Sequence, residues 1–351
     1  MKIFITGTAG FIGYHLTKRL AEESHTITCI DNINDYYDVE LKYDRLAALG
    51  FNRDLLDTTT DDFIVSLIFP SVRFLKTDLC NTERVTALFS KGNFDFVLHL
   101  AAQAGVRYSL SNPHVYISAN IQGFLNILEA ARLYPPRHLV YASSSSVYGL
   151  NSKIPFSEYD AIDQPASLYA ATKRSNELMA HAYSHLHGIP ITGLRFFTVY
   201  GPWGRPDMAP FIFTKSIIEG KPINVFNNGD MKRDFTFIDD IVEGIIRTMN
   251  RVPSENSPCE NMFFENTKDA APAVIYNIGN GRPVQLMDFI HTLEGALGKK
   301  AIINYTPMQA GDVIATWADC SALERDTGFR PFTELTVGIN KFVSWYKNYY
   351  N

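Results

Sequence analysis

The first half of the chain alternates short apolar runs with helical stretches, and this alternation narrows the possible folds more than any other feature. Strands of a parallel sheet are buried on both faces, so they read as nearly continuous apolar runs joined by helices. The pattern predicts an α/β fold with a doubly wound parallel sheet, which binds ligands at the carboxyl ends of its strands. The predicted strands are Ile3–Thr6, Thr26–Ile30, Val72–Lys76, Phe94–Leu100, His138–Ala142 and Ile191–Arg195, and the predicted helices are Gly13–Glu23, Glu83–Ser90, Val115–Leu133 and Tyr169–Leu186.

The pattern becomes less regular after residue 198, where aromatic residues, prolines and Gly-Asn turns are frequent. We expect residues 1–198 to form the sheet domain, with a return segment near 234–250, and residues 199–351 to form mainly a smaller mixed α/β substrate lobe. Helices are predicted in this lobe at Leu286–Leu297 and Val337–Tyr346. The polar, proline-bearing segment Asn250–Pro272 is predicted to be a surface excursion.

Composition excludes several classes of protein. With 46% hydrophobic and 20% charged residues the chain is an ordinary globular protein, and its net charge of −5 gives no basic surface for nucleic acid. Its cysteines, Cys29, Cys80, Cys259 and Cys320, form no C-x-x-C pair, which argues against a zinc site or a disulfide framework. The chain begins with a predicted strand and has no apolar stretch of about 20 residues, so we expect a cytoplasmic protein without signal peptide or membrane span.

A glycine-rich turn follows the first predicted strand and opens the first predicted helix. Its glycines are Gly7, Gly10 and Gly13, a GxxGxxG pattern. In this context glycines allow a tight turn and the close approach of a pyrophosphate, and the free N–H groups of the helix N-terminus attract its charge. The turn predicts dinucleotide binding; the alternative is a purely structural connection.

Asp31, at the end of the second strand, indicates which dinucleotide is bound. A carboxylate there accepts hydrogen bonds from the ribose hydroxyls and repels a 2′-phosphate, which favours NAD over NADP. Further candidates follow the third and fourth predicted strands, namely Asp78, Leu79, Leu100, Ala101, Ala102 and Gln103. Asp78 and Leu79 are suited to the adenine. The small residues Ala101 and Ala102 would let the cofactor lie across the sheet edge. Packing is the alternative explanation for each of these residues.

Tyr169 and Lys173 lie one turn apart on the same face of a predicted helix. The lysine charge and a positive nicotinamide both favour the tyrosinate, which moves the tyrosine pKa from about 10 toward working pH. The serine run Ser143–Ser146 upstream offers a hydroxyl to orient a substrate oxygen. A Tyr-x-x-x-Lys pair alone is common on solvated helix faces, but after a dinucleotide turn and a serine run it predicts hydride transfer with a tyrosine handling the proton.

Motifs along essentially the full length resemble those of the extended short-chain dehydrogenase/reductases. They are GTAGFIG, HLAAQAGVRYS, YASSSSVYG, YxxxK, RFFTVYGPWGRPDM, MKRDFTFIDDIVEGI and the QAGD turn. Within this group the chain is similar to the nucleotide-sugar epimerases, specifically to the UDP-glucuronate 4-epimerases. The resemblance implies a Rossmann-type NAD domain and a smaller C-terminal lobe that binds UDP.

The resemblance also implies a redox-neutral reaction in two stages. Tyr169 takes the proton of the sugar 4-hydroxyl while the C4 hydride passes to tightly bound NAD; the 4-keto sugar then turns over and receives the hydride on its other face. The catalytic serine or threonine of the family falls on Ser144, with a register shift to a neighbouring serine as the alternative. A homodimer packed through Val115–Leu133 and Tyr169–Leu186 is expected. The further cofactor-binding residues that the resemblance implies are Phe11, Ile12, Asn32, Asn120, Ser143, Tyr169, Lys173 and Phe196.

The residues after Ser144 discriminate between related reactions. The related 4,6-dehydratases have a sequence like Thr-Asp-Glu at this place, and the related UDP-glucuronate decarboxylases have one like Thr-Ser-Glu. This chain has Ser145 and Ser146 at the two following positions. Without a carboxylic acid here, elimination of water loses its general acid and base. Epimerisation, which needs neither, is therefore predicted.

Thr198 and Arg205 suggest the sugar. Galactose-type epimerases commonly carry Asn where this chain has Thr198, and the glucuronate epimerases resemble this chain in both residues. A C6 carboxylate needs donors, which hydroxyls could supply, while Arg205 could bind the carboxylate or brace the loop around it. Galactose-type epimerases often have Arg where this chain has Gln309, which weakens the inferred phosphate contacts on that side. The implied substrate-binding residues are Val106, Arg107, Ser144, Ser145, Ser146, Tyr169, Thr198, Arg205, Val225, Phe226, Arg233 and Asp312.

Several alternatives stay open. A different UDP-hexose or UDP-N-acetylhexosamine 4-epimerase is the nearest, followed by a net dehydrogenase or reductase that releases NADH. A non-catalytic sensor of NAD or a nucleotide sugar would not need Ser144, Tyr169 and Lys173 together. His181, His185 and His187 have a spacing that could bind metal, but no acidic third ligand stands nearby, so no metal is expected.

Overall fold

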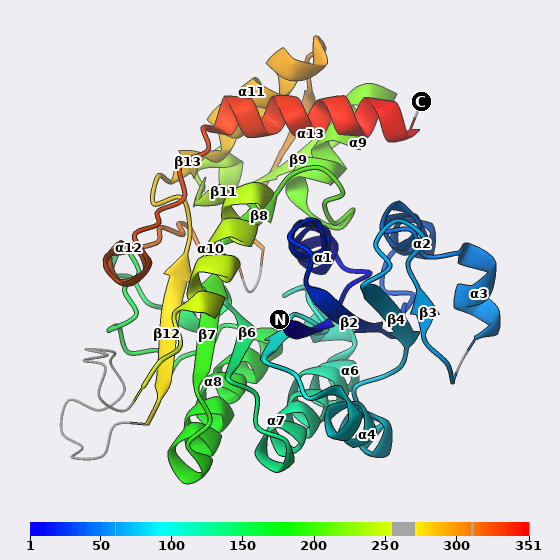
Figure 1. Cartoon of the computed structure of the whole chain (residues 1–351). Helices are drawn as coiled ribbons and strands as arrows, with labels where there is room; N and C mark the ends of the chain where they lie inside the picture. The colour runs from blue at the N-terminus through cyan, green and yellow to red at the C-terminus, as the bar shows by residue number, and fades with distance from the viewer. Residues whose placement is uncertain (60, 255–270, 310–311, 351) are drawn as a thin grey trace.

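One eight-stranded sheet forms the centre of the larger part of the molecule in this computed structural model (Figure 1). The structure describes residues 1–59, 61–254, 271–309 and 312–350. The strands are β1 (Lys2–Thr6), β2 (Thr26–Asp31), β3 (Ile64–Val65), β4 (Val72–Lys76), β5 (Phe96–His99), β6 (His138–Ser144), β7 (Ile191–Phe196) and β12 (Ala273–Ile278). Their order is β12-β7-β6-β5-β1-β2-β4-β3, and all neighbours are parallel except β3 and β4. The predicted fold class is confirmed.

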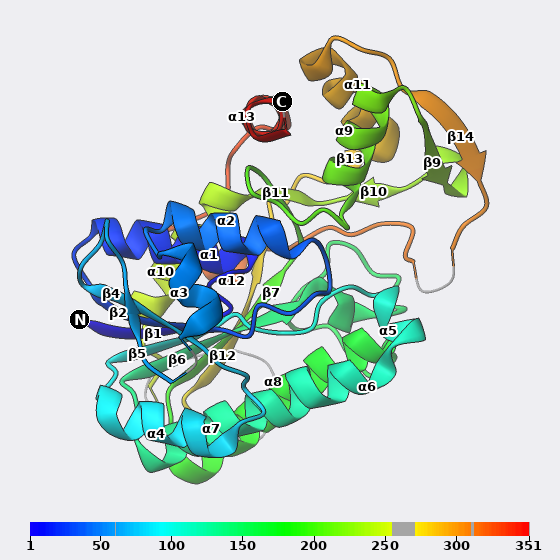
Figure 2. The same cartoon turned by 90° about the vertical axis from the view of Figure 1, so that its right-hand side faces the viewer.

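Helices cover both faces of this sheet, which explains why its strands are so apolar. Figure 2 shows α4, α7 and α8 below the sheet and α1, α2 and α10 above it. The helices of this part are α1 (Phe11–Glu22), α2 (Val39–Ala48), α3 (Arg53–Thr58), α4 (Thr82–Gly92), α5 (Tyr108–Ser111), α6 (Pro113–Tyr116), α7 (Gly123–Leu133), α8 (Leu168–His187), α10 (Ile238–Asn250) and α12 (Ser321–Thr327).

The helix predicted at Val115–Leu133 is not regular. A π-helical turn, Ile117–Gln122, separates α6 from α7. Such turns are uncommon and are often found near functional sites. Here the π turn carries Asn120, which is buried inside the protein and not on the helix surface.

The C-terminal lobe is built from three two-stranded sheets and three helices, and lies beyond the carboxyl ends of the large sheet (Figure 2). The sheet pairs are β8 (Thr198–Tyr200) with β11 (Phe235–Phe237), β9 (Pro222–Phe226) with β14 (Ile302–Thr306), and β10 (Lys232–Arg233) with β13 (Val284–Gln285). The helices are α9 (Ala209–Glu219), α11 (Leu286–Leu297) and α13 (Leu335–Tyr350).

The chain passes between the two parts more than once. The helix α10 packs beside α1 over the large sheet, at the place of the predicted return segment, and β12 adds a further parallel strand next to β7. The sequence prediction did not include β12, because it is an isolated strand after a long irregular segment. The division at residue 198 stays a prediction, since the chain returns to the sheet after it.

Aromatic contacts tie the C-terminal helix α13 to the cofactor side of the molecule. The Trp203 ring lies 5.4 Å from the Trp345 ring and 5.2 Å from the Tyr349 ring, and the Tyr349 hydroxyl donates to Asp44 of α2. The helix predicted at Val337–Tyr346 is thus confirmed as part of α13. No helix within the described ranges is long and apolar enough to cross a membrane.

Two of the sequence predictions concern residues that the structure leaves undescribed. Cys259 and most of the segment predicted as a surface excursion lie in 255–270, outside the described residues. Two of the other cysteines, Cys29 and Cys320, are buried, and Cys80 is half-buried; all three are free thiols.

A buried carboxyl group, Glu158, connects the segment after β6 to β12 by accepting a hydrogen bond from the backbone N–H of Asn277 at 2.7 Å. Burial raises its pKa from 4.5 to about 7. Between these two pH values the folded protein therefore holds a proton that the unfolded chain has released. The free energy of unfolding should fall as pH rises through this window, by roughly 3 kcal/mol from this group.

Replacing Glu158 with Gln, a neutral side chain of the same shape, should remove this contribution. We expect the difference in unfolding free energy between wild type and Glu158→Gln to shift by roughly 3 kcal/mol between pH 4.5 and pH 8, measured by urea denaturation. Glu22→Gln, a change at an exposed site on α1, is the control. Parallel pH curves for wild type and Glu158→Gln would show that Glu158 is ionised throughout.

Candidate active site

A cavity of about 1220 Å³ lies between the large sheet and the C-terminal lobe. Drug-sized ligands occupy roughly 300–1,000 Å³, so this volume suits a larger ligand or two ligands side by side. The predicted site residues that line it are Gly7, Gly10, Phe11, Ile12, Gly13, Asp31, Asn32, Asp78, Leu79, Leu100, Ala101, Ala102, Gln103, Val106, Arg107, Ser143, Ser144, Ser145, Ser146, Tyr169, Lys173, Phe196, Thr198, Arg205, Phe226, Arg233 and Asp312.

The glycine-rich turn forms one end of the cavity, between β1 and α1. Gly7 has φ +81°, and a Cβ atom there would lie 2.8 Å from the backbone N of Ala101. A Cβ atom on Gly13 would lie 2.0 Å from the carbonyl oxygen of Gly7. Both positions therefore require glycine, and the backbone they create leaves the N-terminus of α1 open to a phosphate.

Asp31 stands at the end of β2 beside this turn. Its Oδ2 accepts from the N–H of Ala9 at 3.0 Å and its Oδ1 from the N–H of Ile33 at 2.8 Å. An ionised carboxylate has about four acceptor sites, so two backbone bonds fix its position and leave capacity for ribose hydroxyls. Together the turn and the carboxylate fit the pyrophosphate and ribose of NAD.

Two predicted ligand contacts lie elsewhere. Asn120 is absent from the cavity lining: its side chain binds the backbone N–H and carbonyl of Gln103 at 2.8 and 3.0 Å, and donates to the Thr172 hydroxyl at 3.1 Å. It therefore fixes the loop after β5 and does not face the cavity. Val225 is fully buried inside the C-terminal lobe and is absent from the cavity lining, although its neighbours Asn224 and Phe226 line the cavity.

Ser144, Tyr169 and Lys173 meet at the other end of the cavity, where β6 and α8 lie side by side. Ser144 is the last residue of β6 and receives a hydrogen bond from the N–H of Ser146 at 3.2 Å, which caps the short 3₁₀ turn Ser145–Tyr148. The Ser167 side chain caps the N-terminus of α8, so the helix begins at the next residue, Leu168. Lys173 donates to the Ala142 carbonyl at 2.9 Å, which places its ammonium behind the serine run.

The electrostatics of the tyrosine differ from the sequence-based argument. Burial raises the pKa of Tyr169, and a hydrogen bond with Ser144 and the charge of Arg205 act in the opposite direction. We predicted that the charge of Lys173 would lower this pKa; in the structure Ser144 and Arg205 have that effect. Burial lowers the pKa of Lys173 itself to about 8, against the charge of Glu177.

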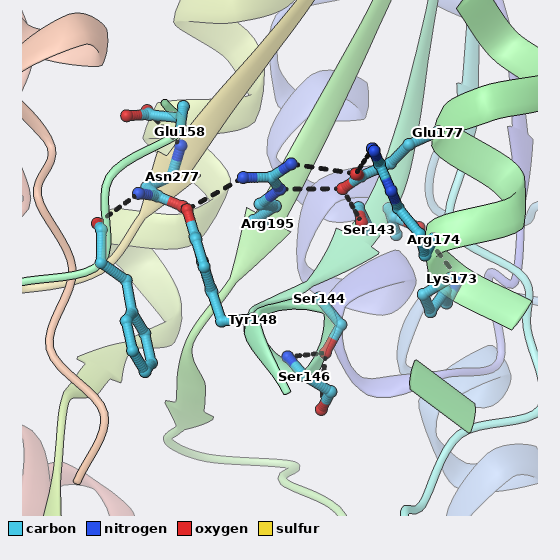
Figure 3. Close-up of polar contacts among 12 residues, drawn as sticks. Ser143, Ser144, Ser146, Tyr148, Glu158, Lys173, Arg174, Glu177, Arg195 and Asn277 are labelled. Atoms are coloured by element: carbon cyan, nitrogen blue, oxygen red, sulfur yellow. Dashed lines mark hydrogen bonds and ion pairs between the residues drawn. The ribbon is translucent and has the colours of Figure 1, made fainter. Parts of the chain in front are cut away.

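A buried polar network supports these residues from behind (Figure 3). The carboxylate of Glu177 on α8 pairs with Arg195 on β7 through two bonds of 2.9 Å, and both side chains are fully buried. The same carboxylate accepts from the Ser143 hydroxyl at 2.7 Å. Ser143 is thereby engaged away from Tyr169, whereas Ser144 is hydrogen-bonded to Tyr169.

The network continues across the sheet to the far side of β7. Arg195 also donates to the Tyr148 hydroxyl at 3.0 Å, which in turn donates to Asn277 of β12 at 2.7 Å (Figure 3). These bonds join the 3₁₀ turn after Ser144 to two strands of the large sheet. The segment around Ser144 is therefore held by the body of the protein on both sides.

Cations from both parts of the molecule line the cavity: Arg107 comes from the segment after β5, and Arg233 from β10 of the C-terminal lobe. Arg107 lies 3.1 Å from Asp312 and 5.0 Å over the Phe226 ring. Arg233 donates to two backbone carbonyls, and burial lowers its pKa. The QAGD turn before Asp312 includes residues 310–311, which are outside the described residues.

Arg205 is committed to a neighbour. Its Nε and Nη2 atoms bind the two carboxylate oxygens of Asp207 at 3.0 and 2.5 Å. Of the two roles suggested for Arg205, this geometry corresponds to a brace within the loop. Asp207 in turn accepts a hydrogen bond from the Tyr36 hydroxyl at 2.8 Å.

Sequence reasoning missed Glu177, Tyr36 and Asp207. Glu177 could have been found, because it lies one turn after Lys173 on the same face of α8. Asp207 could have been found as a carboxylate two residues after Arg205. Tyr36 gave no signal, since its partner is 171 residues away. Within the described part of the chain there is no cluster of three or more His, Cys, Asp or Glu that could hold a metal.

A parallel α/β sheet with this glycine turn and a Ser-Tyr-Lys group defines a short-chain dehydrogenase/reductase with an added substrate lobe. The model of the NAD dependent epimerase/dehydratase family matches residues 3–262. The chain therefore belongs to the NAD-dependent epimerase/dehydratase family. NAD is the cofactor of this family, and the residues around the glycine turn fit it.

Individual relatives cover the whole chain. An uncharacterised 37.6 kDa protein of Escherichia coli O111:H- is 52% identical over 350 residues, which is 100% of this chain and 99% of the relative. A probable UDP-glucuronate 4-epimerase of Rhizobium meliloti (strain 1021) is 46% identical, over 100% of this chain and 98% of the relative. Among solved structures, UDP-glucuronic acid 4-epimerase from Bacillus cereus in complex with UDP-glucuronic acid and NAD is similar, with a TM-score of 0.83, 32% identity and 99% of both chains covered.

The buried ion pair yields a prediction for Glu177→Gln. This change leaves Arg195 buried without a counter-charge, which should lower the free energy of unfolding by roughly 3–5 kcal/mol. It also removes the charge that raises the pKa of Lys173, so that pKa should fall below about 8 and the high-pH limb of activity should move to lower pH. Urea denaturation and a pH–rate profile measure the two effects.

Glu243→Gln is a matched control, because Glu243 forms an exposed ion pair with Arg247 on α10. Exposed pairs contribute at most about 1 kcal/mol, so its unfolding curve should nearly coincide with that of the wild type. Equal stabilities for Glu177→Gln and Glu243→Gln would contradict the importance of the buried pair.

Proposed function

We propose that the protein is a nucleotide-sugar 4-epimerase that interconverts UDP-glucuronate and UDP-galacturonate. The observation that carries this proposal is the arrangement at the end of β6. Ser144 and Tyr169 meet at the cavity with Lys173 behind them, and the next two residues are Ser145 and Ser146 and not carboxylic acids. This site can move a proton and a hydride at one carbon but lacks an acid–base pair for eliminating water.

Each of these residues has a separate role in the proposed reaction. Tyr169 removes the proton from the sugar 4-hydroxyl and Ser144 holds the same oxygen, while the hydrogen bond with Ser144 and the charge of Arg205 act against the rise in the tyrosine pKa. Lys173 donates to the Ala142 carbonyl behind them. NAD, when bound, accepts the hydride from C4 and returns it. The 4-keto sugar turns over between these events, and Tyr169 gives the proton back, so the reaction needs no net oxidant.

Hydroxyl groups are our candidates for binding the C6 carboxylate. Ser145 and Ser146 follow Ser144, and Thr198 opens β8 two residues after Phe196, the β7 residue that pairs with Ser144. All three line the same cavity. We infer that Arg107 and Arg233 hold the diphosphate of UDP, since arginines bind phosphate through charge-assisted bonds. We infer that Asp312 accepts hydrogen bonds from the uridine ribose. The names of the relatives from Rhizobium meliloti and Bacillus cereus support glucuronate as the sugar.

We also propose a homodimer. The outer faces of α7 and α8 expose Leu125, Leu133, Leu178 and Leu186. These helices lie next to each other on one face of the sheet (Figure 2). Two copies joined through this face would cover these apolar side chains without obstructing the cavity, which opens beyond the strand ends.

The product test uses purified protein, UDP-glucuronate and no added cofactor. We expect UDP-galacturonate by NMR without net formation of NADH, because the hydride returns to the sugar. Tyr169→Phe should lower kcat by about 10²–10⁴-fold, since a positioned proton acceptor contributes that much. Its NAD content, measured after denaturation, should match that of the wild type. Conversion of UDP-glucose with none of UDP-glucuronate would overturn the choice of sugar, and stoichiometric NADH would overturn epimerisation.

Thr198→Val tests the carboxylate site. A 4-keto glucuronate is a β-keto acid, and a carboxylate held charged and fixed is less prone to lose CO₂. We expect the variant to bind UDP-glucuronate more weakly and to form a decarboxylated sugar that the wild type does not form, both measured from one NMR time course. Val keeps the shape of Thr, so unchanged binding together with unchanged products would show that Thr198 does not face the carboxylate.

A further inference from the structure

The Tyr36 hydroxyl lies where three cavity-lining segments meet. The segment after β2 carries Tyr36, the segment after β5 carries Gly105 and Tyr108, and the loop after β8 carries Asp207. The Tyr36 and Tyr108 rings are 4.8 Å apart, and the Tyr36 hydroxyl donates to Asp207 at 2.8 Å. One side chain thus connects the cofactor side of the cavity to the substrate side.

The segment after β5 is shaped to admit this hydroxyl. Gly105 has φ +99°, and a Cβ atom there would lie 2.2 Å from the Tyr36 hydroxyl oxygen. Any other residue at position 105 would therefore both strain the backbone and displace Tyr36. Contacts with two other segments therefore fix the position of the Tyr36 side chain.

The loop after β8 has a second, stronger attachment at its base. Arg45, a fully buried residue of α2, donates to the carbonyls of Trp203 and Gly204 and to the carbonyl of Ala9 in the glycine-rich turn. A buried guanidinium with this many bonds is costly to separate from its partners. The bond between Tyr36 and Asp207 is single and only half-buried, so it is the attachment that can open.

We propose that Tyr36 and Asp207 form a clasp that retains NAD in the cavity and holds Arg205 in place, so that both are positioning residues of the reaction. The cofactor side and the loop after β8 can separate only if their hydrogen bond breaks. Retention matters because the hydride must return to the same sugar before the cofactor leaves. The role in retention rests on NAD binding alone, and the role in positioning Arg205 rests on the proposed function.

Asp207 acts on Arg205 through two hydrogen bonds and charge. The Tyr36 ring lies 5.8 Å from the same guanidinium, so Arg205 is held from two sides. Because the charge of Arg205 acts against the rise in the pKa of Tyr169, a displaced Arg205 would make the tyrosine a poorer proton acceptor at a given pH. Asp207 therefore influences Tyr169 without touching it.

The first experiment measures how fast NAD is lost. Wild type, Tyr36→Phe and Asp207→Asn are loaded with NAD and passed repeatedly through gel filtration, and the NAD remaining is quantified by chromatography after denaturation. Both variants should lose NAD about tenfold faster than the wild type, as expected for breaking one hydrogen bond to a charged group. Tyr36→Phe removes one oxygen and keeps the ring contact with Tyr108, so it should fold like the wild type, which circular dichroism checks.

Tyr43→Phe is the matched control for retention. Tyr43 also donates from its hydroxyl to an aspartate, Asp57, but away from the cavity. It should lose NAD at the wild-type rate. Equal rates in wild type, Tyr36→Phe and Asp207→Asn would overturn the clasp, as would an equal acceleration in Tyr43→Phe.

The second experiment separates retention from positioning by assaying UDP-glucuronate conversion with saturating NAD. Asp207→Asn removes the negative charge that holds Arg205 and leaves only a weaker, neutral acceptor for the Tyr36 hydroxyl, so its kcat should fall about tenfold further than that of Tyr36→Phe. Equal kcat values would overturn the positioning role. Wild type that converts no UDP-glucuronate would instead overturn the proposed function, and the rates of NAD loss would still decide whether the clasp retains the cofactor.

Discussion

The rest of the site depends on the buried ion pair between Glu177 and Arg195. A carboxylate and a guanidinium lose their hydration in the interior, and only close pairing with further hydrogen bonds offsets that cost. Here the pair binds Ser143 on one side and Tyr148 on the other, so it fixes the end of β6 and the turn after it. The helix α8, which carries Tyr169 and Lys173, and strand β7 are joined in the same way. A small change at Glu177 would therefore disturb the positions of Ser144 and Lys173 together.

The two halves of the cavity are held to different degrees. The cofactor half is rigid, because the glycines leave no space for side chains and Asp31 is fixed by two backbone N–H groups. The substrate half combines a buried anchor at Arg45 with the weaker link between Tyr36 and Asp207. In our proposal this weaker link is the one that must break before the cofactor can leave.

Much of this arrangement was predictable from local pattern. Six of the eight strands of the large sheet were found from apolar runs, and their bounds differ by no more than a few residues from those observed. The short edge strand β3 was missed because two residues carry no period, and β12 because it follows an irregular segment. Asn120 was assigned to the cofactor from the family resemblance alone, whereas the structure places its side chain against Gln103 and Thr172, contacts between distant segments that no local pattern shows.

The sequence by itself determined the elements whose chemistry is local: the glycine turn, the carboxylate at the end of β2, the serine run, and a tyrosine and lysine one turn apart. Each depends on residues close together in the chain, so spacing is sufficient to find it. Only the tertiary structure decided which serine faces Tyr169, what Arg205 binds, and that Tyr36 reaches Asp207. These depend on burial and on contacts between segments up to 171 residues apart, for which no local spacing exists.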